Sequence, residues 1–180
     1  MESEMYFRII IGCTFRWFDV DYPEVVELRR RLFPEQRGYR MVGCSLADLD
    51  WLGQVPHDHP AMIVAEGVSM YLTEDILRTL LHRLLDHFPS GQVAFDVHPS
   101  QLVWLLTKLG ANVRGTGAVF RWGIDNPKDI KKLEPRLDLV SELMAHDLIG
   151  NYPTPWTMRT LIHVMDSTRI LRVMRCLLFE

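Results

Sequence analysis

The sequence Ala61-Met-Ile-Val-Ala-Glu66 continues through Gly67-Val-Ser-Met-Tyr-Leu72 into Thr73 and a long amphipathic segment. The unbroken apolar run is typical of a strand that is covered on both faces of a parallel sheet. Thr73 is a favourable N-cap, and apolar residues recur at steps of three and four from Ile76 to Phe88, which predicts a helix there. Alternation over Gln92–Val97 predicts the next strand, so this unit indicates an α/β fold.

The pattern extends in both directions from this unit. Upstream, we expect a strand over 14–21, a helix over 23–33 that begins at Pro23, and a strand over 39–44. Downstream, helical spacing favours residues 102–109, 127–133 and 155–165, whereas 119–122, 137–144 and 173–179 are expected strands, the last at an antiparallel edge. No shift in composition separates a second domain, so residues 1–180 are expected to form one domain.

Composition limits the classes of function. The chain has 180 residues, of which 48% are hydrophobic and 24% charged, and its net charge of −3 offers no attraction to nucleic acid or anionic lipid. No stretch reaches the roughly 20 apolar residues of a membrane span. Cys13, Cys44 and Cys176 are few, odd in number and far apart, which argues against a disulfide framework and a zinc site and favours a cytoplasmic location. The sequence leaves open whether the chain forms a homo-oligomer.

Candidate site residues follow from one rule: open α/β sheets bind ligands beyond the carboxyl ends of their strands. Asp19 and Asp21 end the first expected strand on one face, where a carboxylate accepts hydrogen bonds from a ribose diol, although Asp21 capping the next helix is an equal alternative. Glu66 ends the most buried strand, and Asp96 has the same placement but ranks lower.

Other residues carry weaker signals. On local grounds, Ser45 and Leu46 form an ordinary turn after the second strand, and Tyr71 is a core or pocket aromatic. His57 and His59 flank Asp58 in a turn bounded by proline, so we predict no metal site. The sequence contains no G-x-G-x-x-G, P-loop or G-x-S-x-G pattern.

Three stretches together resemble a known family. They are Trp17–Arg29, Tyr39–Leu52 and Pro60–Leu72, and the shorter segments Phe88–Gly91 and Arg121–Pro127 add to them. In order and spacing they are similar to the S-adenosylmethionine-dependent O-methyltransferases of the leucine carboxyl methyltransferase and polyketide O-methyltransferase type. The resemblance implies a Rossmann-like methyltransferase sheet with flanking helices.

The resemblance also implies roles for single residues. Asp21, with Asp19 beside it, would hold the ribose of the cofactor S-adenosylmethionine. Ser45 and Leu46 would lie against the adenine, and Glu66 would face the methionine end and the substrate. Such an enzyme moves a methyl group to an oxygen in one in-line displacement, so we assign no catalytic base.

Two departures qualify the resemblance. Leucine carboxyl methyltransferases have an acidic residue where this chain has Ser45, which favours a small-molecule acceptor of polyketide type. The family also has a strand and a glycine-rich turn ahead of the first acidic strand, where this chain offers only Gly12-Cys13. We therefore expect a sheet without its first strand and glycine-rich loop. A non-catalytic relative that serves as an interaction module is the alternative, and a nicotinamide-dependent oxidoreductase ranks third because the fingerprint glycines are missing.

Overall fold

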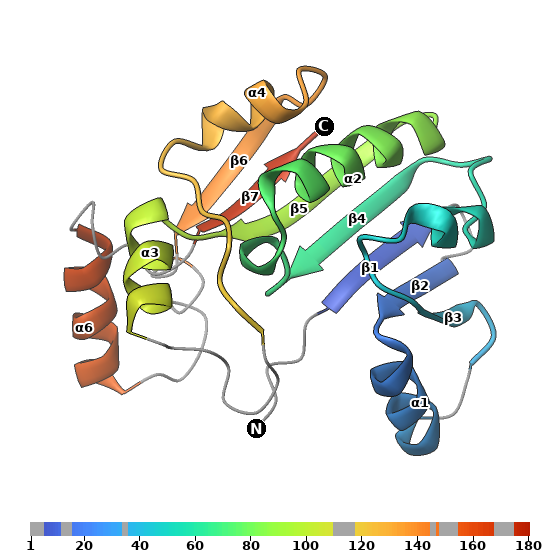
Figure 1. The fold of residues 1–180 in the computed structure, drawn as a ribbon, viewed down its shortest axis with the longest axis horizontal. Coiled ribbons are helices and arrows are strands. Elements are labelled where there is room, and N and C mark those ends of the chain that lie inside the picture. The colour runs from blue at the N-terminus through green and yellow to red at the C-terminus, as the bar shows by residue number, and fades with distance from the viewer. Residues whose placement is uncertain are drawn as a thin grey trace.

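The computed structural model describes residues 6–11, 16–33, 36–109, 118–144, 147, 155–167 and 175–180. Its seven strands form one sheet, and helices flank them (Figure 1). The strands are β1 (Tyr6–Ile11), β2 (Arg16–Asp21), β3 (Tyr39–Gly43), β4 (Ala61–Glu66), β5 (Gly91–Val97), β6 (Leu139–Met144) and β7 (Arg175–Phe179). The helices are α1 (Pro23–Leu32), α2 (Glu74–His87), α3 (Ser100–Lys108), α4 (Ile130–Leu133) and α6 (Trp156–Ser167), with 3-10 turns η1 (Leu49–Gln54), η2 (Ser69–Tyr71) and η3 (Pro127–Asp129).

The order of the strands is β3-β2-β1-β4-β5-β7-β6. β2 pairs with β3 in parallel, as β4 does with β5, which confirms the predicted α/β class. β7 is antiparallel to its neighbours, as expected, but it lies between β5 and β6 and not at the edge. The strand expected over 119–122 is wrong, because these residues form a loop.

The middle of the sheet differs from the expectation of a vacant position. β1 fills it and runs antiparallel to both β2 and β4. Its six residues pair along their length with β4, so the two halves of the sheet are joined by backbone hydrogen bonds. A parallel strand followed by a glycine-rich turn is not among the described residues.

The main core lies on the face of the sheet that α2 covers (Figure 1). Thr73 caps α2 by accepting a hydrogen bond from the Ile76 N–H group. The buried leucines of α2 recur at helical spacing and pack on inward side chains of β4 and β5. These residues are Leu77, Leu80, Leu81, Leu84, Ala65, Val93 and Phe95.

α1 packs against the opposite face. Phe18 and Val20 of β2 belong to the core under α2, so the alternating residue Asp19 points the other way. Its carboxylate accepts a hydrogen bond from Arg29 Nη2 of α1 at 3.0 Å. The two faces of β2 therefore carry different helices.

Candidate functional site

The carboxyl ends of β2 and β4 lie at one edge of the sheet. Phe7 of β1 pairs with Val20 on one side and with Ala65 on the other, so these two residues stand at the same level. The next residues along each strand are Asp21 and Glu66. Because one strand lies between them, their backbones are separated by two strand spacings, about 10 Å.

Asp21 and Glu66 also share a face. Val20 and Ala65 belong to the core beneath α2, and successive side chains of a strand alternate. Asp21 and Glu66 therefore point to the opposite face, the one on which α1 lies. Sequence reasoning placed these two acids at the tips of neighbouring strands; the structure places them at one edge and on one face, but with β1 between their strands.

The backbone at the end of β2 is held on both sides. The Tyr22 N–H group donates to the Asp21 carboxylate at 2.7 Å, and the Cys44 N–H group donates to the Asp21 carbonyl at 2.8 Å. The first bond is not a helix cap, because the N-cap of α1 is Tyr22 and no side-chain cap hydrogen bond forms there, so it does not support the alternative in which Asp21 caps α1. The second ties the end of β3, and with it Ser45, to the end of β2.

Asp19 takes a different position from its expected role. It is buried, at 4% exposure, and its carboxylate accepts hydrogen bonds from Arg29 of α1 and the Tyr39 hydroxyl of β3. Burial and the Asp19 carboxylate raise the pKa of Tyr39, so the phenol stays a donor at neutral pH. The structure thus turns Asp19 toward α1 and away from the open edge, where Asp21 lies.

Ser45 and Leu46 begin the turn that follows β3. The Ser45 hydroxyl accepts a hydrogen bond from the Ala47 N–H group at 3.3 Å, and the Ser45 carbonyl accepts one from Asp48. Leu46 is half-buried against the core and lines a hollow of about 190 Å³ with Ala47, Leu49, Asp75, Ile76 and Thr79. Ser45 and Leu46 therefore form the expected turn, and Leu46 contributes to one wall of the hollow.

Cys44 lies beside this turn and is not a nucleophile. Burial, followed by the carboxylates of Asp48 and Asp21, raises the pKa of its thiol to about 11. At neutral pH the thiol is therefore protonated and behaves as a small apolar group.

A network from β5 fixes the turn after Glu66. Gly67 has a φ of 66°, in the left-handed region that favours glycine, and its N–H group donates to Asp96 Oδ1 at 2.8 Å. The Ser69 hydroxyl donates to the Asp96 carbonyl at 2.5 Å, and His98 Nε2 lies 3.6 Å from Asp96 Oδ2. Sequence reasoning ranked Asp96 below Glu66, and its place at the end of a parallel strand was the signal available.

Tyr71 lies in η2, which follows this turn. Its ring stacks on Phe120 with centroids 5.3 Å apart. The Arg121 and Trp122 N–H groups both donate to the Met70 carbonyl, which holds the loop carrying Phe120 against η2. Phe120 was missed from the sequence because the segment around it was interpreted as a strand.

The remaining candidates do not gather at this edge. Arg16 pairs with Asp58, and the His59 ring contacts Asp58, in an exposed turn. Within the described ranges, no group of three or more His, Cys, Asp or Glu side chains is placed to hold a metal. None of the described helices has the length and apolar character needed to cross a bilayer.

Two curated proteins are similar in sequence. The tetracenomycin polyketide synthesis O-methyltransferase TcmP of Streptomyces glaucescens is 45% identical over 133 residues, which are 73% of this chain and 48% of that protein. The S-adenosyl-L-methionine-dependent methyltransferase dpfgK of Gibberella zeae is 32% identical over 165 residues, 83% of this chain and 54% of that protein. The chain thus spans about half the length of these relatives. No protein-family model matches it.

The fold has counterparts among solved structures. A DUF574 family protein from Streptomyces avermitilis superposes with a TM-score of 0.61 at 14% identity, covering 91% of this chain and 64% of that one. At this identity the likeness speaks for the fold alone. Together with the two sequence relatives and the strand order, it supports one conclusion. The chain is similar in sequence to two methyltransferases, TcmP and dpfgK, over about half the length of each, and it has a Rossmann-like fold.

Proposed function

We propose that residues 1–180 form a single methyltransferase domain, or part of one, that binds S-adenosylmethionine and methylates an oxygen of a small, polyketide-type molecule. The observation that carries this proposal is the placement of Asp21 and Glu66 at one edge and on one face of the sheet. Two sequence relatives are named as methyltransferases, one for an O-methylation in polyketide synthesis and one that depends on the same cofactor.

The residues present fit the two ends of this cofactor. A carboxylate at the tip of β2 suits a ribose diol, because each hydroxyl donates a hydrogen bond to an anionic acceptor. The half-buried Leu46, in the turn that follows β3, offers an apolar side chain to a flat base near the tip of β2. Glu66 is exposed at the far end of the same edge, where an ammonium group is a favourable partner.

Each side chain has a separate task in this proposal. Asp21 and Glu66 orient the two ends of the cofactor, and Tyr71, stacked on Phe120, forms an apolar wall for the acceptor. Asp19 acts indirectly, by fixing α1 and β3 around the tip of β2. The cofactor supplies the reactive methyl group, and the protein supplies alignment and the exclusion of water.

Location and partners are part of the proposal. The cysteine pattern favours the cytoplasm, and the acceptor is expected to be a small molecule. The alternative is a relative that has kept the fold without binding the cofactor and acts by pairing with another chain. The exposed apolar side chains of α1 are the observation that supports this alternative.

Calorimetric titration of the 180-residue chain with S-adenosylhomocysteine tests the proposal. We expect saturable binding that Asp21→Ala weakens at least about tenfold, since each lost charged hydrogen bond costs roughly 1.5–3 kcal/mol. Asp138→Ala is the matched control, because Asp138 is an exposed acid that pairs with Lys131 away from the edge. If the wild-type chain gives neither heat nor thermal stabilisation, the proposed activity fails for this chain and the alternative stands.

A further inference from the structure

The outer surface of α1 is apolar. Val25 is 37% exposed, Leu28 48% and Leu32 64%, and Tyr22 and Phe33 at the two ends of the helix are 50% and 58% exposed. Val26 is the buried residue of this helix. Contiguous apolar side chains on a surface mark sites of association more often than isolated ones do.

These side chains form one stripe. The spacing from Tyr22 to Val25, Leu28 and Leu32 is three, three and four residues, which keeps them on one side of a helix. The inner side of α1 is fixed to the sheet by Val26 and by the ion pair between Arg29 and Asp19. The stripe therefore cannot turn inward. We call Tyr22, Val25, Leu28, Leu32 and Phe33 the α1 stripe.

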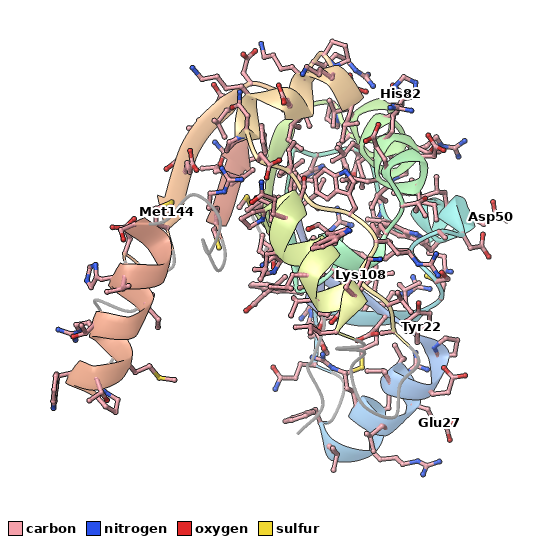
Figure 2. All side chains as sticks on the ribbon, turned by 60° about the vertical axis from the view of Figure 1, so that its left-hand side comes forward. Tyr22, Glu27, Asp50, His82, Lys108 and Met144 are labelled. Carbon is pink, nitrogen blue, oxygen red and sulfur yellow. The ribbon has the colours of Figure 1, made fainter. Side chains whose placement is uncertain are left out.

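Charge along α1 is divided between its two halves. Glu24 and Glu27 lie in the first half, and Arg29, Arg30 and Arg31 in the second. Arg29 is held by Asp19, and Arg30 donates to the Met41 carbonyl, so both are committed to the sheet. The side chain of Arg31 is 70% exposed and forms an ion pair within the helix with Glu27, which Figure 2 places at the periphery of the molecule, so Arg31 is held at the surface and not by the sheet.

The α1 stripe and its flanking charges are complementary to a second copy of α1 that runs in the opposite direction. Glu24 and Arg31 are seven residues apart, which is close to two helical turns, so they flank the stripe on the same side. When two copies of α1 pack antiparallel, equivalent flanks face each other and an acidic half meets a basic half. Such a contact has two-fold symmetry and therefore gives a closed dimer rather than a longer assembly.

We propose that the α1 stripe is a homodimer interface in which two copies of α1 pack antiparallel about a two-fold axis near Leu28. Val25 then packs on the partner's Leu32, and Glu24 pairs with the partner's Arg31, each contact occurring twice. Tyr22, which directly follows Asp21, meets the partner's Phe33. The second copy consequently adjoins the edge of the sheet at which Asp21 lies.

The size of the contact predicts its strength. Two short helices bury an area in the class below about 1,200 Å², which is typical of weak and reversible association. We therefore expect monomer and dimer to exchange, with the dimer favoured as the concentration rises. The proposal concerns α1 alone and does not depend on the methyltransferase activity.

Charge exchange across the two-fold axis tests this arrangement, with sedimentation velocity over a wide concentration series as the measurement. We expect Glu24→Arg and Arg31→Glu each to raise the dimer dissociation constant roughly tenfold, because each creates two like-charge contacts. An equimolar mixture of the two variants should recover wild-type affinity, since every cross pair in that heterodimer joins opposite charges. The double variant should recover it as well.

Controls separate this interface from general effects. Glu74→Arg on α2 changes an exposed acid in the first turn of another helix and should leave the dimer unchanged. Leu28→Glu should abolish the dimer, whereas Leu105→Glu on α3, also at an exposed leucine, should not. Circular dichroism verifies that each variant is folded. A wild-type chain that stays monomeric at all concentrations overturns the proposal, and so does a dimer whose two single variants fail to restore each other.

Discussion

At the scale of single residues, Asp96 connects the ends of two strands. Its carboxylate is buried, at 3% exposure, and accepts from the Gly67 N–H group, while its carbonyl accepts from the Ser69 hydroxyl. A buried carboxylate is costly unless hydrogen bonds compensate for the lost water. The turn after β4, and with it the position of Glu66, is therefore set by a residue of β5.

Replacement of Asp96 separates geometry from charge. Asp96→Asn keeps an oxygen acceptor for the Gly67 N–H group, so we expect the exchange of that amide with solvent to stay slow. Asp96→Val removes the acceptor, and we expect faster exchange of Gly67 together with a loss of about 1–3 kcal/mol in unfolding free energy. Amide exchange by NMR and urea titration measure both. Equal protection of Gly67 in the two variants would contradict this account.

Sequence alone predicted the positions of some of the candidate residues, for a physical reason. Asp21 and Glu66 end parallel strands, and the carboxyl ends of such strands share an edge, so their proximity follows from the pattern. Alternation also put Asp19 on the face of Asp21, which is correct. The alternating pattern carried no information on Arg29 and Tyr39, which contact Asp19, because these contacts depend on how α1 and β3 pack against β2.

At the scale of elements, a charged cluster fastens the segment of α4 to α2. The Glu134 side chain is 3% exposed and receives hydrogen bonds from Arg136 Nε at 2.8 Å and from Nη2 at 2.9 Å. Arg136 also donates to Asp86 of α2, and His82 of α2 lies 3.0 Å from Glu134. The Arg136 hydrogen bonds lower the pKa of Glu134 from 4.5 to about 2.

This cluster predicts a pH dependence of stability. An acid whose pKa is lowered on folding stabilises the protein above its unfolded pKa, and that contribution disappears as pH falls through the folded pKa. For Glu134 the window runs from about 4.5 down to about 2. We expect Glu134→Gln to lose about 2 kcal/mol at pH 7, since solvent around the 43% exposed Arg136 screens the pair, and to flatten the decline in that window.

Urea titrations of wild type and Glu134→Gln between pH 2 and pH 7 measure this difference. Glu142→Gln is a suitable control because the Glu142 side chain is more exposed, at 33%, and pairs with Arg175 elsewhere. Parallel curves for wild type and Glu134→Gln throughout the window would show that Glu134 does not provide the acid-sensitive stability.

Elements with strong local signals were predicted closely. α2 has a capping threonine and a leucine stripe, and it begins and ends within a residue or two of the expected bounds. β1 was missed because its six residues are too few to define a periodic pattern, and its direction depends on its partners. The same holds for β7, whose place between two strands depends on contacts that are distant in sequence.

At the scale of the whole molecule, β1 holds the sheet together. On one side stand β2 and β3, and on the other β4, β5, β7 and β6, with β1 as the strand that pairs with both groups (Figure 1). The stability of a domain is only about 5–15 kcal/mol, so we do not expect the fold to survive the loss of a strand that pairs on both sides. Integrity of the fold therefore depends on six residues close to the N-terminus.

Deletion of residues 1–15 tests this dependence. We expect the shortened chain to lose cooperative thermal unfolding and to bind a hydrophobic dye, because two groups of strands are left with unpaired edges. Deletion of residues 1–5 alone is the control, since it leaves β1 in place. Calorimetry and dye fluorescence provide the readout, and a cooperative transition in the longer deletion would refute the role given to β1.

The direction of β1 has a practical consequence. Tyr6 pairs with Glu66, so any polypeptide joined ahead of Tyr6 leaves the sheet at the edge where Asp21 and Glu66 lie. An affinity handle joined directly to Tyr6 would therefore begin beside the candidate site, and we expect it to compete with a ligand for space. At the other terminus, the Glu180 N–H group donates to the Asp138 carbonyl, beside the outermost strand β6, which makes it the safer place for attachment in every binding experiment.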